Sequence, residues 1–164
     1  MLPTREEAER ELVAAWMRAG IANPRENLIL AATNADVARL NREAQASRWE
    51  AGQLGYRAVQ VGEERIHEGN RILFTDTDKR LGLVKSEFAT VTRIDRLSQR
   101  LTVQIDGQDE LVRFSLREFD ALRLGYAATV HCAQGMTLEQ DAYVLLGGSM
   151  QNREMTYVQI SRAG

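Results

Sequence analysis

The chain lacks several features that would place it in whole classes of protein. It contains one cysteine, Cys132, which excludes an internal disulfide and fits a reducing cytoplasm, where we expect the protein to reside. No run of about 18 or more apolar residues occurs, so we expect no membrane-spanning helix. The N-terminus is polar and acidic, unlike a signal peptide. The net charge of −2 argues against a small basic clamp that holds nucleic acid by bulk charge.

A phosphate-binding loop for ATP is also missing. Lys85-Ser86 is the only lysine followed by serine or threonine. The loop motif requires glycine directly before the lysine and a second glycine five residues earlier, but these positions hold Val84 and Lys79. No apolar strand ends in Asp-Glu to hold magnesium. We therefore expect that this chain alone does not bind and hydrolyse ATP by the usual route.

The first third of the chain has the pattern of alternating helix and strand. Thr4 stands three residues before Glu7, the spacing of a helix capping box, and Gly20 and Pro24 would end that helix. The run NLILAAT has strand length, and Thr33 then caps a second helix that ends near Gly52. The expected buried positions of the two helices are Ala8, Leu12, Ala15, Trp16 and Ala19, then Val37, Leu40, Ala44 and Trp49.

The middle of the chain changes to short β-type runs. RILFT, FATVTRID, LTVQID and ELVRFSL follow one another without a helix between them, and Asp106-Gly107 is typical of a hairpin turn. Such a series indicates a small barrel or sheet. The α/β pattern then returns with LRLGYAATV, AYVLLGG and TYVQISRA, the last of which is expected to be a helix. We therefore expect an α/β protein in which residues 69–117 form an all-β insertion between segments 1–68 and 118–164.

Polar residues gather where the strand of TVHCAQG meets a glycine-containing turn. If the strand continues through this run, Thr129 and His131 share one face and line the same groove. Gln134 could bind a base or orient a water held by phosphate. The alternative is an ordinary strand end with no ligand.

Three further features of the sequence are possible sites. Thr33 and Asn34 begin a helix, where N–H groups and the helix dipole attract anions, although Thr33 could equally act only as the cap. Arg162 could stabilise a transferring phosphoryl group or be a solvated arginine. Cys132 beside His131 is a poor thiol nucleophile pair because neighbours on a strand face opposite ways. No metal site is expected.

Taken together, these motifs resemble one family. LILAATNADVARLN, the β-rich segment GNRILFTDTDKRLGLVKSEFATVTRID, LRLGYAATVHCAQGMT and TYVQISRA are similar, in that order, to the C-terminal part of the RecD-like helicase region of conjugative relaxase–helicases of the TraA, TraI and TrwC type. The resemblance covers nearly the whole chain. It implies a partial RecA-like parallel sheet interrupted by an SH3-like barrel, with the last two motifs corresponding to helicase motifs V and VI.

The resemblance also implies roles for individual residues. Arg162 would reach the γ-phosphate of ATP as an arginine finger, and Gln134 and Gly135 would lie near the nucleotide. Thr33, Asn34, Thr129 and His131 would contact single-stranded DNA. ATP and Mg²⁺ would bind only in the complete helicase, whose N-terminal RecA-like domain, in the same or another chain, would supply the phosphate-binding loop.

The sequence departs from the family pattern at several positions. Cys132 stands where many relatives have lysine, and Thr137 where glutamate is common. Lys85-Ser86 and Ala89 replace the Asn-Gly and later glycine usual in the barrel, and the end at Gly164 suggests an excised piece or a truncated gene. These departures leave open an alternative: a stand-alone or vestigial helicase-derived module that binds nucleic acid or protein without catalysis.

Overall fold

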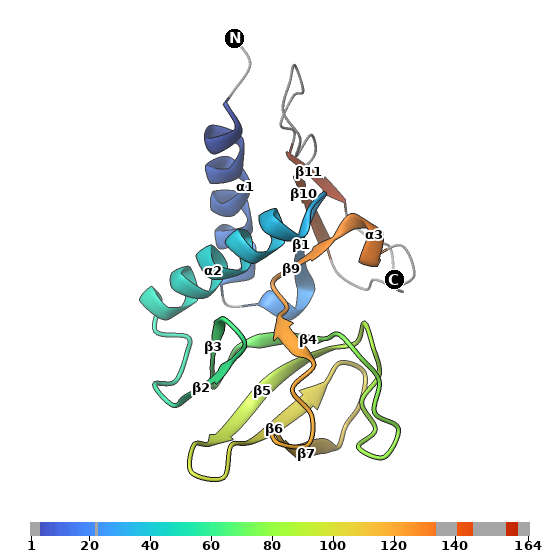
Figure 1. Ribbon diagram of the computed structural model, residues 1–164. Coiled ribbons are helices and arrows are strands. Elements are labelled where there is room, and N and C mark those ends of the chain that lie inside the picture. The colour runs from blue at the N-terminus through green and yellow to red at the C-terminus, as the bar shows by residue number, and fades with distance from the viewer. Residues whose placement is uncertain (1–3, 22, 134–140, 146–156, 161–164) are drawn as a thin grey trace. The chain divides into compact units, whose positions relative to one another are not determined.

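The computed structural model describes residues 4–21, 23–133, 141–145 and 157–160. The chain forms two compact units (Figure 1), and the first of them is discontinuous in sequence. Unit 1 is made of residues 1–51 and 126–164, and unit 2 of residues 52–125. Unit 2 therefore extends beyond the range 69–117 that the sequence suggested for the insertion.

Unit 1 is a small α/β unit built on a four-stranded sheet. Its elements are α1 (Arg5–Gly20), a 3-10 turn η1 (Pro24–Glu26), β1 (Asn27–Ala31), α2 (Asn34–Glu50), β9 (Ala127–Thr129), α3 (Val130–Ala133), β10 (Asp141–Leu145) and β11 (Tyr157–Ile160). The strand order is β11-β10-β1-β9. β10 and β9 both run parallel to β1, and β11 runs antiparallel to β10.

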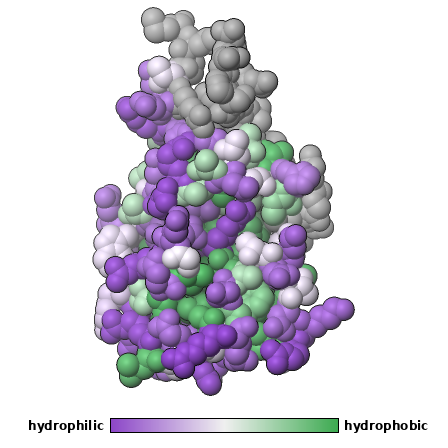
Figure 2. Space-filling model, viewed as in Figure 1, coloured by the Kyte–Doolittle hydropathy of each residue, from purple (hydrophilic) through white to green (hydrophobic). Residues whose placement is uncertain are grey.

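Both long helices begin at the expected threonines. The hydroxyl of Thr4 accepts a hydrogen bond from the backbone N–H of Glu7, and that of Thr33 accepts one from Asp36, each at 3.1 Å. These bonds satisfy N–H groups that have no partner inside the helix. The outer surface of α1 and α2 seen in Figure 2 is mostly hydrophilic, as expected for helices that bury one face only.

The expected buried stripe of α2 is correct except at its end. Val37, Leu40 and Ala44 are buried, but Trp49 is 49% exposed and Arg48 is buried in its place. Helical periodicity explains this, because position 48 lies four residues after Ala44 and continues the same face. The guanidinium of Arg48 donates to the carbonyl of Ile21 at 2.9 Å and to the hydroxyl of Tyr126 at 3.0 Å, which compensates its burial.

The segment TYVQISRA does not begin as the expected helix. Tyr157–Ile160 forms β11 and pairs with β10, with Val144 opposite Val158. Aromatic and β-branched residues favour a strand wherever a neighbouring strand offers its edge. The remainder of the segment lies outside the described residues.

The strands of unit 2 all pair in antiparallel fashion. Its strands are β2 (Ala58–Val61), β3 (Glu64–His67), β4 (Arg71–Phe74), β5 (Phe88–Asp95), β6 (Arg100–Ile105), β7 (Leu111–Ser115) and β8 (Leu122–Leu124). β2 and β3 form a hairpin, and the others form a sheet of order β7-β6-β5-β4-β8. The predicted β6–β7 hairpin is confirmed, with Gln104 opposite Leu111 and Gly107 in the turn at φ +83°.

The run LRLGYAATV, expected as a single piece of the last α/β segment, is divided between the two units. β8 pairs with β4 in unit 2, and β9 belongs to unit 1. The division falls after Gly125. A Cβ atom at Gly125 would lie 2.7 Å from the carbonyl carbon of Ile72, so a larger residue would collide with the backbone of β4. Glycine lets the chain leave the sheet of unit 2 at this point.

An ion pair joins the buried Arg71 to the half-buried Asp106 across the sheet of unit 2. The side chain of Arg71 is 1% exposed, and its two terminal nitrogens lie 2.7 Å from the two carboxylate oxygens of Asp106. The guanidinium also stacks on Phe88, 5.5 Å from the ring centroid. A buried guanidinium is tolerated only with such compensation, so removal of the carboxylate would leave an uncompensated charge in the core.

We expect the substitution Asp106→Asn to lower the free energy of unfolding of unit 2 by about 3 kcal/mol, because it leaves Arg71 charged, buried and only partly hydrogen-bonded. Urea denaturation followed by circular dichroism measures the loss. Arg80→Gln is the control, since its ion pair with Asp78 spans 3.8 Å at the surface and should contribute less than about 1 kcal/mol. Equal effects of the two substitutions would contradict the role given to the Arg71–Asp106 pair.

Candidate functional site

The candidate site lies at the carboxyl ends of the parallel strands β1 and β9. The two strands are neighbours in the sheet, and their register pairs Ala31 with Thr129. Thr33 and Asn34 are the second and third residues after β1, and His131 is the second residue after β9. The fold therefore brings four of the predicted site residues, from two distant parts of the sequence, to one edge of the sheet. The carboxyl ends of these strands, which we call the β1–β9 edge, are where open α/β sheets usually bind ligands.

The β1 side of this edge is the N-terminus of a long helix. α2 spans 17 residues, and both Thr33 and Asn34 are exposed at its start. The Thr33 hydroxyl caps the helix, so the capping role that the sequence allowed is present. The first N–H groups and the positive end of the helix dipole still face outward at this end, which favours a negatively charged ligand.

The β9 side differs from the expectation. β9 ends at Thr129, and Val130–Ala133 forms the short helical turn α3. The Thr129 hydroxyl accepts a hydrogen bond from the N–H of Cys132 at 2.9 Å, which draws the chain into the turn. Thr129 and His131 therefore do not share a strand face, and Cys132 and His131 are not neighbours on a strand, contrary to both expectations. His131 is exposed beside the edge.

Three predicted residues lie outside the part of the chain that the structure describes. They are Gln134, Gly135 and Arg162. Their proposed roles toward ATP remain predictions.

A buried asparagine that the sequence did not single out holds β9 in place. The Oδ1 atom of Asn41 in α2 accepts hydrogen bonds from the N–H groups of Tyr126 and Ala127, both at 2.8 Å. Its Nδ2 donates to the carbonyl of Ala127 at 3.3 Å. One side chain thus ties α2 to the point where the chain re-enters unit 1. The contact spans 85 residues, and only the position of Asn41 in the buried helix stripe could have indicated it.

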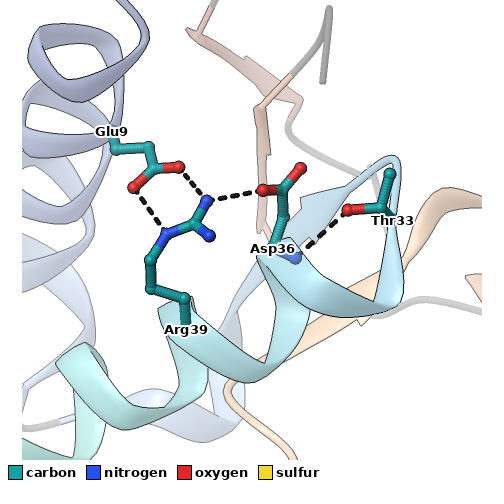
Figure 3. A network of polar contacts seen from close by, with 4 residues as sticks. All are labelled: Glu9, Thr33, Asp36 and Arg39. Atoms are coloured by element: carbon teal, nitrogen blue, oxygen red, sulfur yellow. Dashed lines mark hydrogen bonds and ion pairs between the residues drawn. The ribbon is translucent and has the colours of Figure 1, made fainter. Parts of the chain in front are cut away.

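A second polar network connects the N-terminal turn of α2 to α1 (Figure 3). Arg39 donates hydrogen bonds to Glu9 of α1 and to Asp36 of its own helix. The hydrogen bond to Glu9, and after it the one to Asp36, holds the pKa of the Arg39 guanidinium above its usual range. Asp36 is fully buried and Glu9 is 7% exposed, so the network supports the helices from within. It sets the direction in which the N-terminus of α2 points.

The described residues offer neither a metal centre nor a membrane-spanning helix. They contain no group of three or more histidine, cysteine, aspartate or glutamate residues placed to hold a metal ion. No helix among them is both long and apolar enough to cross a membrane.

We expect Asn41→Leu to lower the free energy of unfolding of the chain by about 3 kcal/mol, because two buried backbone N–H groups lose their acceptor. The measurement is urea denaturation followed by tryptophan fluorescence. Arg42→Leu is the matched control on the exposed face of the same helix and should change the free energy by about 0.5 kcal/mol or less. If Asn41→Leu were as mild as its control, the tether would not hold β9.

Comparison with known proteins identifies relatives over nearly the whole chain. No protein-family model matches the sequence. The conjugal transfer protein TraA of Agrobacterium fabrum is 30% identical over 162 residues, and that of Rhizobium radiobacter is 31% identical over 160. Each alignment covers 95% of this chain but only 14% of the relative, so the chain spans a small part of the length of these proteins.

The fold is also found in solved helicase structures. A Pif1 helicase from Bacteroides in complex with ADP-AlF3 and single-stranded DNA matches 90% of this chain and 40% of its own, with a TM-score of 0.59 and 16% identity. The Bacteroides Pif1 bound to single-stranded DNA matches the same shares, with a TM-score of 0.52 and 18% identity. At these identities the likeness is one of fold. The chain is thus homologous, over almost all of its length, to one segment of the TraA conjugal transfer proteins, and it shares its fold with part of the Pif1 helicase from Bacteroides.

Proposed function

We propose that the chain is the C-terminal portion of an ATP-dependent superfamily-one DNA helicase that acts in conjugative DNA transfer in the cytoplasm. In this proposal unit 1 is the second RecA-like domain and unit 2 its SH3-like barrel insertion. The observation that carries the proposal is the convergence of Thr33 and Asn34 with Thr129 and His131 at one edge of the sheet. The homology to TraA proteins and the shared fold with Pif1 support it.

The chemistry of this edge suits the backbone of single-stranded DNA. The start of α2 offers N–H groups and the positive end of a helix dipole to a phosphate. Asn34 and His131 are exposed and able to donate hydrogen bonds beside it. Contacts of this kind read phosphate and sugar, so they grip DNA with little preference for sequence, as a translocating motor requires.

The ATP-dependent part of the proposal needs a second domain. Arg162 is the arginine finger, and Gln134 and Gly135 lie near the nucleotide. The phosphate-binding loop and Mg²⁺ belong to an N-terminal RecA-like domain in the same or another chain, so this chain alone is inactive as an ATPase. ATP held between the two domains would draw them together, and the segment from β9 to Arg162 would couple that closure to the grip on DNA.

We expect His131→Ala to weaken the binding of this chain to a fluorescein-labelled oligothymidine by about fivefold at low salt, because a hydrogen bond to the DNA backbone is lost. Fluorescence anisotropy measures the affinity. His131 is exposed, so the fold should be unaffected, and Gln108→Ala, at an exposed position of unit 2, is the control. An unchanged affinity of the His131 variant would argue against DNA binding at this edge.

We expect Arg162→Ala, made in the full-length helicase, to reduce ATP turnover on the order of 10³-fold, because the charge on the transferring phosphoryl group loses its guanidinium. A steady-state ATPase assay with saturating single-stranded DNA measures the effect. Arg10→Ala, on the exposed face of α1, should leave turnover unchanged. If the Arg162 variant kept the wild-type rate, Arg162 would not be the arginine finger.

A further inference from the structure

The turn of the β5–β6 hairpin in unit 2 borders a hollow with an excess of arginines. The hairpin lies at the lower left of Figure 1. The hollow has a volume of about 260 Å³ and is lined by Arg57, Arg93, Ile94, Asp95, Arg96 and Leu97. Three arginines thus face one carboxylate, in a chain whose net charge is −2.

An irregularity in β5 gives Arg93 its exposed position. The pairing of β5 with β6 shifts between Val91 and Arg93, so that Thr92 is an extra residue. Thr92 and Arg93 are both exposed, whereas Val91 and Ile94 are buried. In a regular strand one of two neighbouring residues would face the core, so the β-bulge adds an outward-facing position beside the hairpin turn.

The hairpin turn itself is held by hydrogen bonds within its own residues. Asp95 accepts through Oδ1 from the N–H groups of Leu97 and Ser98, at 3.1 and 3.3 Å. The side-chain amide of Gln99 donates to the carbonyl of Arg96 at 2.7 Å, and Gln99 adopts the left-handed conformation at φ +56°. These contacts define the backbone that carries Arg93 and Arg96, so a ligand would meet a formed surface.

The two carboxylates near the hollow, those of Asp95 and Glu68, accept hydrogen bonds from backbone N–H groups. The hydrogen bonds from the N–H groups of Ser98 and Leu97 hold the pKa of the Asp95 carboxyl below its usual value and engage its oxygen in the turn. Glu68 accepts from the N–H of Ile94 at 2.9 Å, and its distance to the guanidinium of Arg57 is 3.9 Å, which makes a weak ion pair. Within the described residues, no carboxylate lies within ion-pair distance of the guanidinium groups of Arg93 or Arg96. Their charge is therefore available to a ligand.

We propose that this hollow binds the phosphate backbone of a nucleic acid, at a surface distinct from the β1–β9 edge. Guanidinium groups match phosphate oxygens with paired N–H donors, and several of them around one hollow suit consecutive phosphates. Tyr56 is 73% exposed and directly precedes Arg57, so an aromatic ring is available for an unpaired base to stack on. The choice of nucleic acid over an acidic peptide rests on the proposed helicase function, but none of these residues belongs to the β1–β9 edge.

The test is fluorescence anisotropy of the whole chain with labelled oligothymidine and with a duplex of equal length, over a salt series. For Arg93→Gln with Arg96→Gln, we expect the slope of log affinity against log salt on the single strand to become shallower by about 1.4, since each phosphate contact contributes about 0.7. Arg80→Gln with Arg117→Gln removes two exposed charges of unit 2 that do not line the hollow and should leave the slope unchanged. Tyr56→Leu should weaken single-strand binding about fivefold or more at constant slope, and leave duplex binding unchanged.

The binding data for these variants and for His131→Ala distinguish a failure of this inference from a failure of the proposed function. A shallower slope for the Arg93/Arg96 variant, with His131→Ala neutral, would support the hollow and overturn the β1–β9 edge. The inference is overturned if the Arg93/Arg96 variant keeps the wild-type slope, or if the wild-type chain binds neither DNA at low salt. Tighter binding of a polyglutamate peptide than of DNA, lost in the Arg93/Arg96 variant, would also overturn it in favour of an acidic protein partner.

Discussion

The structure of unit 1 depends on how the chain is held when it returns from unit 2. One side chain, Asn41, accepts hydrogen bonds from the N–H groups of Tyr126 and Ala127 and donates to a carbonyl of the same segment. These backbone groups are buried, so without Asn41 they would lose their partners at a substantial cost. Tyr126 adds an edge-on contact with Trp16 and a hydrogen bond from Arg48. The polar groups of α2 thereby define where β9 joins the sheet. An insertion the size of unit 2 is tolerated because the entropy of closing a loop rises only slowly with its length.

The candidate site follows from this closure. Because β9 is fixed beside β1 in parallel register, Thr129 comes to lie at the same edge as Thr33. Each threonine accepts a hydrogen bond from the N–H three residues ahead, so each strand is followed at once by a helical turn. The ion pairs of Arg39 with Glu9 and Asp36 then orient the start of α2. The hydrogen bonds of the two threonines thus shape the end of each strand. The long-range contact of Asn41 places the two strands side by side.

The sequence predicted the local parts of this arrangement and missed the long-range ones. The cap at Thr33, the apolar stripe of α2 and the β6–β7 hairpin are patterns of a few neighbouring residues, and the structure contains them. The sequence pattern predicted a buried Trp49 because Trp49 is apolar and Arg48 is charged. The burial of Arg48 depends on hydrogen-bond partners that are distant in sequence. β11 was expected to be helical because its pairing with β10 leaves no signal in a short segment. Apart from its position on the buried face of α2, nothing in the sequence distinguishes Asn41, since its partners follow 85 and 86 residues later.

Contact between the β1–β9 edge and single-stranded DNA is the proposal on which the helicase function depends. Titration of the isotopically labelled chain with oligothymidine, followed by the amide signals in nuclear magnetic resonance spectra, tests it residue by residue. We expect the signals of Thr33, Asn34, Thr129 and His131 to shift together and to saturate at one DNA concentration. If those four signals remained in place while others shifted, or if no signal moved at low salt, the edge would not be a DNA-binding site and the claim would be contradicted.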